Sequence, residues 1–349
     1  MIDLKLIEQL TNAWGVSGNE NQVRHLIRKQ IEKNVDDIRV DAVGNLIAFK
    51  KASPARKLRR TGKILKVMIA GHMDEVGLMI THIDKSGYLK FDKVGGIDDR
   101  VLLAKRVLVG KDRIPGIIGV RPIHMLYRKG EDKKVSSHED LLIDIGAASQ
   151  EEAQRCVSMG DYVMFDTPFE DWGGLVKGKA FDDRTGCYLM IELLKKRYNF
   201  DLYAAFTTQE EIGLRGGRVA AYRTLPDVAF ILEGTGAGDF PMHSAKDISK
   251  IPALGKGPVI TIMDRSVFCD KGLVKLLIDT AKAKRIPVQI KRPGIGGTDA
   301  GRIHMTREGV KTVVLAVAAR YIHSPACLTS KKDVAAGLKL MEEVFKKLK

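Results

Sequence analysis

Histidine and acidic side chains follow four of the most apolar runs of the chain. These runs cover residues 64–70, 202–206, 228–232 and 312–317, and each has the composition of a buried central strand. In an open α/β sheet, ligands bind in the crevice beyond the carboxyl ends of the strands. The sequence therefore predicts one site at that edge, and its candidate residues are His72, Asp74, Glu210, Glu211, Glu233 and His323.

His72 and Asp74 are suited to holding a metal ion. They stand two residues apart on chain that should be extended, so their side chains point to the same side. Asp74 can then orient the imidazole while the other ring nitrogen binds the ion. A single histidine after a strand is more often structural, and it is the convergence of the other residues that favours a metal site.

Two pairs of adjacent carboxylates belong to the same predicted edge. Asp182 and Asp183 precede a helical pattern, where one can cap the helix while the other faces the crevice, unless both are caps. Glu210 and Glu211 should diverge from a strand end, so one can bind metal while the other acts as a base. The alternative for this second pair is a solvated surface feature. Nitrogen and oxygen ligands without thiolates suit zinc, cobalt or manganese, and the histidines favour zinc or cobalt.

The elements that must position these residues alternate between strands and helices. Apolar residues recur at helical spacing near the N-terminus and again between and after the apolar runs. This alternation predicts an α/β fold in which helices flank a sheet. The expected helical segments are residues 4–10, 20–31, 183–196, 272–285 and 331 to the C-terminus.

The segment from residue 76 to residue 169 has a different pattern. It is rich in glycine and in short β-branched runs, with few helical stretches. We interpret it as a small inserted β-rich domain. The alternative is a set of long loops, but about ninety residues without structure would be unusual inside a compact domain.

Composition and charge limit the function classes. The 349 residues predict two domains of a folded globular protein. A formal net charge of +15 raises nucleic acid as a partner, but no aromatic-interleaved basic motif or zinc finger is present. Four scattered cysteines indicate neither disulfides nor a thiolate zinc site, and there is no signal-peptide core or membrane-length apolar run. We expect a cytoplasmic protein without nucleic-acid or membrane partners.

Much of the positive charge lies in residues 50–66, which hold eight basic residues and no acidic one. A solvated loop or hairpin between two strands is the simplest interpretation of this stretch. Subunit contacts or the attraction of acidic peptides are the alternatives.

Five ordered motifs resemble one family. They are GHMDEVGLM at 71–79, AFDDRTGC at 180–187, TTQEEIGLRG at 207–216, GGTDAG at 296–301 and RYIHSP at 320–325. Together they are similar to the dinuclear-metal aminopeptidases of the glutamyl-aminopeptidase and tetrahedral (TET) aminopeptidase family, some of which are labelled endoglucanases. The resemblance implies a zinc-peptidase-like mixed sheet flanked by helices, formed by residues 1–75 and 170–349. Residues 76–169 would form a β-rich dimerisation domain.

The resemblance also implies a role for each candidate residue. His72 and Glu233 would bind one divalent ion, Glu211 and His323 a second ion, and Asp182 would bridge the two. Many members carry aspartate where this chain has Glu233, which leaves the geometry and the preferred metal at that position open.

The same resemblance makes Glu210 the general base and Asp74 the partner of His72. Two ions activate a bridging water and polarise the scissile carbonyl, and Glu210 moves the proton to the leaving amine. The glycine loop at 296–301 lacks the lysine and the spacing of a phosphate loop, so phosphate binding is not expected. The resemblance implies that this loop lies at the active site and shapes the substrate pocket, and a tight turn is the alternative.

The implied function is the removal of N-terminal residues from peptides, with self-association into dimers and a tetrahedral dodecamer. Another dinuclear hydrolase, such as an amidase or deacylase, uses the same metal chemistry and is the first alternative. A basic nucleic-acid-binding protein is the second.

Overall fold

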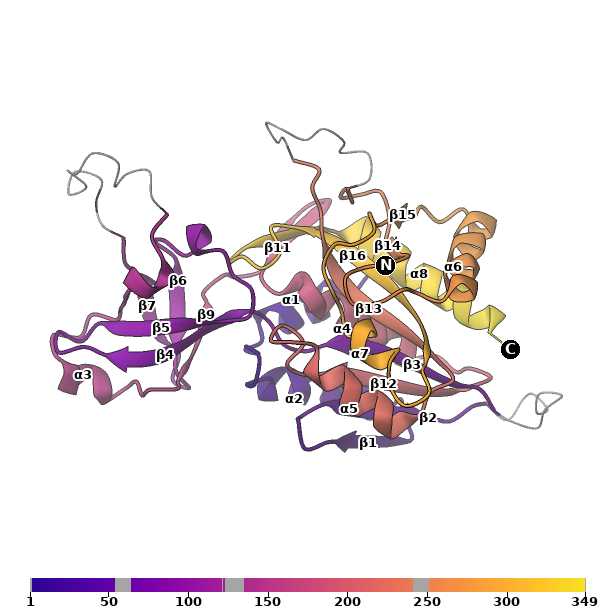
Figure 1. The fold of residues 1–349 in the computed structure, drawn as a ribbon, viewed down its shortest axis with the longest axis horizontal. Coiled ribbons are helices and arrows are strands. Elements are labelled where there is room, and N and C mark those ends of the chain that lie inside the picture. Colours follow the sequence, from indigo (N-terminus) through magenta and orange to yellow (C-terminus); the bar gives the residue numbers. More distant parts are fainter. Residues whose placement is uncertain (1, 54–63, 121, 123–134, 241–250, 349) are drawn as a thin grey trace.

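The computed structural model describes residues 2–53, 64–120, 122, 135–240 and 251–348. An eleven-stranded mixed sheet forms its larger part, and a closed six-stranded barrel forms the smaller part (Figure 1). The predicted fold class, a helix-flanked α/β sheet with an inserted β-rich unit, is confirmed. Within the described residues, no helix combines the length and the apolar character needed to cross a membrane.

The large sheet has the strand order β1-β2-β12-β3-β13-β16-β17-β11-β10, and β14 and β15 extend it beside β16. The central strands β12, β3, β13 and β16 are parallel neighbours. From β2 outward to β1, and from β17 outward to β10, each strand pairs antiparallel with its neighbour. The bounds are β1 Asp37–Val40, β2 Leu46–Lys50, β3 Lys66–His72, β10 Glu170–Trp172, β11 Leu175–Gly178, β12 Asp201–Thr207, β13 Val228–Gly236, β14 Val259–Thr261, β15 Gln289–Ile290, β16 Lys311–Arg320 and β17 Cys327–Ser330.

Helices cover both faces of this sheet. On β3, Met68 contacts Thr224 of α5, whereas a Cβ at Gly71 would lie 3.0 Å from Met190 of α4. Met68 and Gly71 are three residues apart on the strand, so they face opposite sides of the sheet. Helices α4 and α5 therefore cover opposite faces. The bounds are α1 Leu4–Asn12, α2 Asn21–Ile31, α4 Phe181–Leu194, α5 Arg215–Thr224, α6 Lys271–Lys284, α7 Ala300–Ile303 and α8 Lys331–Lys347.

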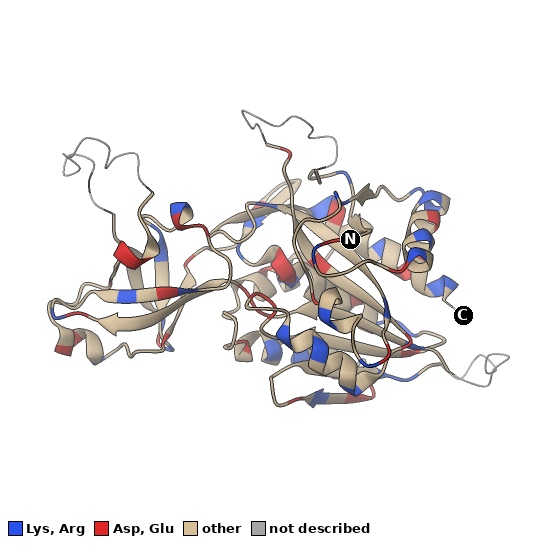
Figure 2. Ribbon diagram, in the orientation of Figure 1, with Lys and Arg blue, Asp and Glu red and all other residues tan. Residues whose placement is uncertain are grey.

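Helix α4 lies at the centre of the larger part. It packs against β3 and β13, and α1, α2 and α8 pack around it. Twelve of its fourteen residues are buried, so its sequence lacks the apolar stripe of a surface helix. The outer helices α5, α6 and α8 carry many of the lysines and arginines, as Figure 2 shows.

The barrel closes in the order β4-β5-β8-β7-β6-β9 around an apolar core of its own. Alternating residues such as Leu78 and Ile80 of β4 point into this core, as expected for strands with one buried face. The bounds are β4 Gly77–Ile83, β5 Leu89–Val94, β6 Arg106–Val109, β7 Ile114–Ile118, β8 Ile143–Asp144 and β9 Tyr162–Phe165, with α3 Gln150–Gln154 and the 3₁₀ turns η1 Asp99–Val101 and η4 His138–Asp140.

The basic stretch at residues 50–66 runs from the last residue of β2 to the first residue of β3, and its residues 54–63 are outside the described part of the chain. Its first residue is not solvated, contrary to the loop interpretation. Lys50 is buried, and its ammonium donates to the carbonyl oxygens of Leu194, 2.5 Å away, and Asn34, 2.7 Å away. It thus neutralises the C-terminal end of α4, where carbonyls lack helical partners.

Candidate metal centre

The carboxyl ends of the central strands bring the predicted residues to one edge of the sheet. His72 ends β3, Glu210 and Glu211 follow β12, and His323 follows β16. Glu233 lies inside β13, because this strand continues to Gly236 beyond its apolar run. Parallel strand ends therefore gather these side chains as expected.

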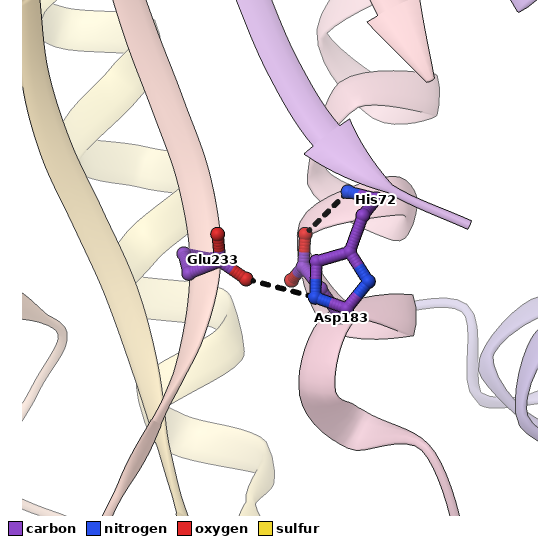
Figure 3. Close-up of side chains that lie close together, drawn as sticks. All are labelled: His72, Asp183 and Glu233. Carbon is purple, nitrogen blue, oxygen red and sulfur yellow. Dashed lines mark hydrogen bonds and ion pairs between the residues drawn. The ribbon is translucent and has the colours of Figure 1, made fainter. Parts of the chain in front are cut away.

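The first half of the cluster centres on His72. Its Nε2 atom lies 3.1 Å from Glu233 Oε1 and 3.4 Å from Asp182 Oδ1. Figure 3 shows His72 and Glu233 facing each other from neighbouring strands. Glu210 is farther away, with Oε2 3.9 Å from the same nitrogen.

The second half centres on His323. Its Nε2 atom lies 3.3 Å from Glu211 Oε2 and 3.6 Å from Asp182 Oδ2. The ring is oriented by the carbonyl oxygen of Gly96, 2.9 Å from Nδ1. Asp182 thus directs one carboxylate oxygen toward each histidine.

Asp183 is also close to the first half, but its carboxylate is engaged elsewhere. It lies within 4.8 Å of His72 and Glu233. Its oxygens accept the backbone N–H of His72, 3.2 Å away, and of Gly186, 2.8 Å away (Figure 3 shows the former). Asp183 therefore accepts a backbone amide in the first turn of α4, while Asp182 faces the crevice. This is the first of the two alternatives left open by the sequence, in which one aspartate caps the helix and the other faces the site.

Asp74 connects the two halves through a buried network. Its carboxylate accepts the backbone N–H of Glu210 (3.0 Å) and of Glu211 (3.1 Å), together with the hydroxyl of Ser17 (2.5 Å). The shortest contact to the ring of His72 is the backbone oxygen of Asp74, 3.0 Å from Nδ1, whereas the carboxylate Oδ1 is 3.4 Å away. Asp74 thus holds the imidazole through both groups and also fixes the turn that carries the two glutamates.

Glu210 and Glu211 lie in this turn and not on the strand, which ends at Thr207. Gln209 has a φ of 56°, so the chain leaves the extended conformation just before them. The two side chains diverge because of the turn, one toward His72 and the other toward His323.

The electrostatics of the cluster favour the binding of positive charge. Burial raises the pKa of Glu211 to about 8 and that of Glu233 to about 7. Burial alone would lower the pKa of His323, but its hydrogen bond to Asp182 and the charge of Glu211 raise it to about 9. Glu233 Oε2 is buried without a hydrogen-bond partner among the described residues. An unpartnered carboxylate oxygen amid imidazoles and further carboxylates is a donor set that fits divalent cations.

A cavity of about 410 Å³ opens beside the cluster. The metal-centre carboxylates line one part of it, and Ile251, Ile295 and Ile322 provide apolar wall. Gly296, Gly297 and Thr298 of the glycine loop also line it. Substrate can therefore approach the cluster from this side.

Sequence reasoning missed Asp299, the acidic residue of the glycine loop. It is 1% exposed, and its Oδ2 accepts the hydroxyl of Thr207 at 2.6 Å. Its Oδ1 has no hydrogen-bond partner among the described residues, and burial raises its pKa to about 6. An aspartate within GGTDAG was visible, but no spacing rule links it to the strand ends.

A buried ion-pair network beside the centre was also missed. Glu75 accepts Lys179 Nζ at 2.6 and 2.7 Å and Arg184 Nη2 at 3.1 Å. Glu75 is three residues after His72, and the two cations flank Asp182 in the sequence. The network therefore ties the segments that carry two of the candidate ligands to each other.

Comparison with known proteins places the chain in one family. The sequence model of the family described as M42 glutamyl aminopeptidase matches residues 44–340 of this chain. The chain is 33% identical to the lysyl aminopeptidase of Pyrococcus furiosus over 370 residues, covering 100% of this chain and 98% of that protein.

Solved structures agree over the whole length. A TET aminopeptidase from a Thaumarchaeota archaeon of marine sediment has a TM-score of 0.91 and 36% identity, with 99% and 97% of the two chains covered. The TET1 peptidase of Pyrococcus horikoshii has a TM-score of 0.85 and 33% identity, with 99% of each chain covered. The chain therefore belongs to the M42 glutamyl aminopeptidase family and is a metal-dependent aminopeptidase.

Proposed function

We propose that this protein removes N-terminal residues from peptides with two divalent cations held at the cluster. Asp182 carries the proposal, because its carboxylate lies between His72 and His323 with one oxygen toward each. His72 and Glu233 would complete one cation site, and Glu211 and His323 the other. Each site then combines one imidazole, one carboxylate of its own and the shared carboxylate.

Such cations, when bound, polarise the scissile carbonyl and lower the pKa of a water between them. The donor set has only nitrogen and oxygen atoms, so zinc or cobalt is favoured and manganese is possible. Glu233 reaches its histidine at 3.1 Å, so the longer side chain at this position still directs a carboxylate oxygen into the cluster.

Glu210 is the proposed general base. Its carboxylate lines the cavity next to the cluster but lies 3.9 Å from His72, farther than Glu233 or Asp182. From there it can take the proton of the attacking water and pass it to the leaving amine. Asp74 is proposed as a positioning residue, because its carboxylate holds the backbone of the Glu210 turn.

The solved relatives support a proposal about assembly. We assign residues 1–75 and 170–349 to the catalytic domain and 76–169 to a dimerisation domain. The Pyrococcus horikoshii relative assembles into a tetrahedron or a large octahedral shell. We propose dimers that form a tetrahedral dodecamer here, and light scattering on purified protein tests the mass. The four free cysteines fit a reducing cytoplasm as the proposed location.

Glu210→Gln tests the mechanism. We expect this variant to keep both cations and to lose more than about a hundredfold in kcat, because only the proton transfer is removed. Metal content by mass spectrometry and kinetics on aminoacyl p-nitroanilides are measured together. Retained turnover would remove Glu210 from the base role.

The same assay separates aminopeptidase from amidase or deacylase activity. Free and N-acetylated forms of each aminoacyl substrate are compared, with zinc, cobalt or manganese added. An aminopeptidase requires the free amine, so turnover of the acetylated forms alone would contradict the proposed function.

A further inference from the structure

We propose that Asp299 is a positioning residue that joins the glycine loop at 296–301 to the turn carrying Glu210 and Glu211. Through Asp299, the wall of the substrate cavity and the general base are held in a fixed relation to each other. The inference rests on the role proposed above for Glu210.

Asp299 stands at the start of α7, but its carboxylate is used elsewhere. It is the N-cap residue of α7, and its side chain makes no capping hydrogen bond to the described residues of that helix. Aspartate at an N-cap commonly accepts an N–H of its own helix, which contributes about 1 kcal/mol. The Asp299 residue is 1% exposed, and its carboxylate contacts β12 and α5, the elements on either side of the glutamate turn. The side chain therefore connects distant segments in place of stabilising its own helix.

One oxygen of Asp299 holds the residue that precedes the turn. The hydroxyl of Thr207, the last residue of β12, lies 2.6 Å from Asp299 Oδ2 and 3.2 Å from the carbonyl oxygen of Gly71. A hydroxyl has one proton, so the shorter bond to the carboxylate is the stronger one. Thr207 pairs with His72 between β12 and β3. Asp299 therefore fixes the end of β12 beside a candidate metal ligand.

The other oxygen lies against the helix that follows the turn. A Cβ at Gly217, the third residue of α5, would lie 2.7 Å from Asp299 Oδ1, so the carboxylate packs directly on the backbone of α5. The N-cap residue of this helix is Leu214, whose side chain has no polar atom to cap it. A helix N-terminus carries partial positive charge and favours a nearby carboxylate. Oδ1, which has no hydrogen-bond partner among the described residues, is placed against this charge.

The two contacts enclose residues 208–214. Asp74 holds the middle of this turn through the N–H groups of both glutamates, and Asp299 holds its two ends. Thr298, immediately before Asp299, lines the substrate cavity. A substrate that contacts this wall is therefore aligned with Glu210 through one buried side chain. Because a misplacement of about 1 Å can cost about a hundredfold in rate, loss of Asp299 should act mainly on kcat.

Asp299→Ala and Thr207→Val remove the contact from its two sides. We expect each variant to lose about 10- to 100-fold in kcat, with KM changed by less than about threefold. Kinetics are measured per folded molecule on the best substrate of an aminoacyl p-nitroanilide panel. Zinc or cobalt is added in excess, so that weaker cation binding does not contribute to the loss. If Asp299→Ala does not fold, the nearly isosteric Thr207→Val still decides.

Two further variants separate positioning from stability. Thr207→Ser keeps the hydroxyl, so its kcat should remain within about threefold of that of the unmodified protein. Thr224→Val is the matched control, because it removes a buried hydroxyl that donates to the carbonyl oxygen of Ala220, 2.9 Å away, at the other end of α5. This control should lower the Tm and leave kcat per folded molecule unchanged.

The outcomes separate the inference from the role on which it rests. Unchanged kcat in Thr207→Val, or an equal loss in Thr207→Ser, would overturn the positioning role of Asp299. A rise in KM at unchanged kcat in Asp299→Ala would also overturn it, since Asp299 would then shape the cavity alone. Full turnover in Glu210→Gln would refute the base role of Glu210, whereas a low kcat there beside unchanged kcat in Asp299→Ala would refute the inference alone.

Discussion

Replacing two neighbouring aspartates separates cation binding from helix capping. Asp182 places one carboxylate oxygen 3.4 Å from His72 and the other 3.6 Å from His323. Asparagine at position 182 keeps one acceptor oxygen but puts an NH₂ group in place of the other, so one cation loses a ligand and faces a donor. We expect Asp182→Asn to retain at most one cation per subunit and to lose more than about a hundredfold in kcat/KM.

Asp183→Asn is the matched control, one residue away and fully buried. The carboxylate of Asp183 accepts two backbone N–H groups, at 3.2 and 2.8 Å, and asparagine can replace only one of these acceptors without reorientation. The lost charge-assisted hydrogen bond should cost about 1.5–3 kcal/mol of stability. We expect both cations to remain and the Tm to fall by about 2–4 °C per kcal/mol.

Both variants are measured for bound metal by mass spectrometry after desalting, and for Tm at one fixed heating rate. The contrast between the two variants is the result that matters. If Asp183→Asn lost metal to the same degree as Asp182→Asn, the capping role would be wrong. Asp183 would then join His72 and Glu233 as a ligand, an arrangement that their mutual distances also permit.

Three further predictions concern the bound cations, a buried ion-pair network and an aromatic cluster. Removal of divalent cations with a chelator should abolish peptidase activity and lower the Tm, because the buried carboxylates lose their counter-charge. Activity in protein shown to be free of metal would contradict this prediction. Glu75→Gln leaves Lys179 and Arg184 buried without a counter-charge, so denaturant titration should show a loss of about 3–5 kcal/mol, and a loss below about 1 kcal/mol would refute the pairing. Phe345→Ala removes a ring that packs edge-on against three aromatic rings and should cost about 3–5 kcal/mol in the same titration, with kcat per folded molecule unchanged.

The parallel centre of the fold could be predicted because its strands are buried on both faces. Such strands are continuous apolar runs, and the polar residues that follow them are conspicuous. His72 and His323 were found in this way. The antiparallel strands toward the edges could not be found, because they are short or half-exposed, as β10 is with all three residues exposed.

The ends of elements depend on contacts that a local pattern does not contain. β13 continues to Gly236 because it pairs with β16 along its whole length, although Gly234 and Gly236 carry no apolar side chain. The position of Glu233 inside the strand follows from that pairing. The position of Asp299 also depends on a contact between distant parts of the chain, because its carboxylate accepts a hydrogen bond from Thr207 at the end of β12.

Counting charges could not distinguish the basic residues that matter for function. Among the described residues, four lysines and arginines are buried, and packing gives each a different role. Lys50 binds the last carbonyl of α4, and Lys179 and Arg184 share the carboxylate of Glu75. Lys291 is the one of the four that has no such partner in the described part of the chain. Lys291 lines the cavity beside the metal centre instead, so its position in the fold, and not the net charge of the chain, determines what it can contact.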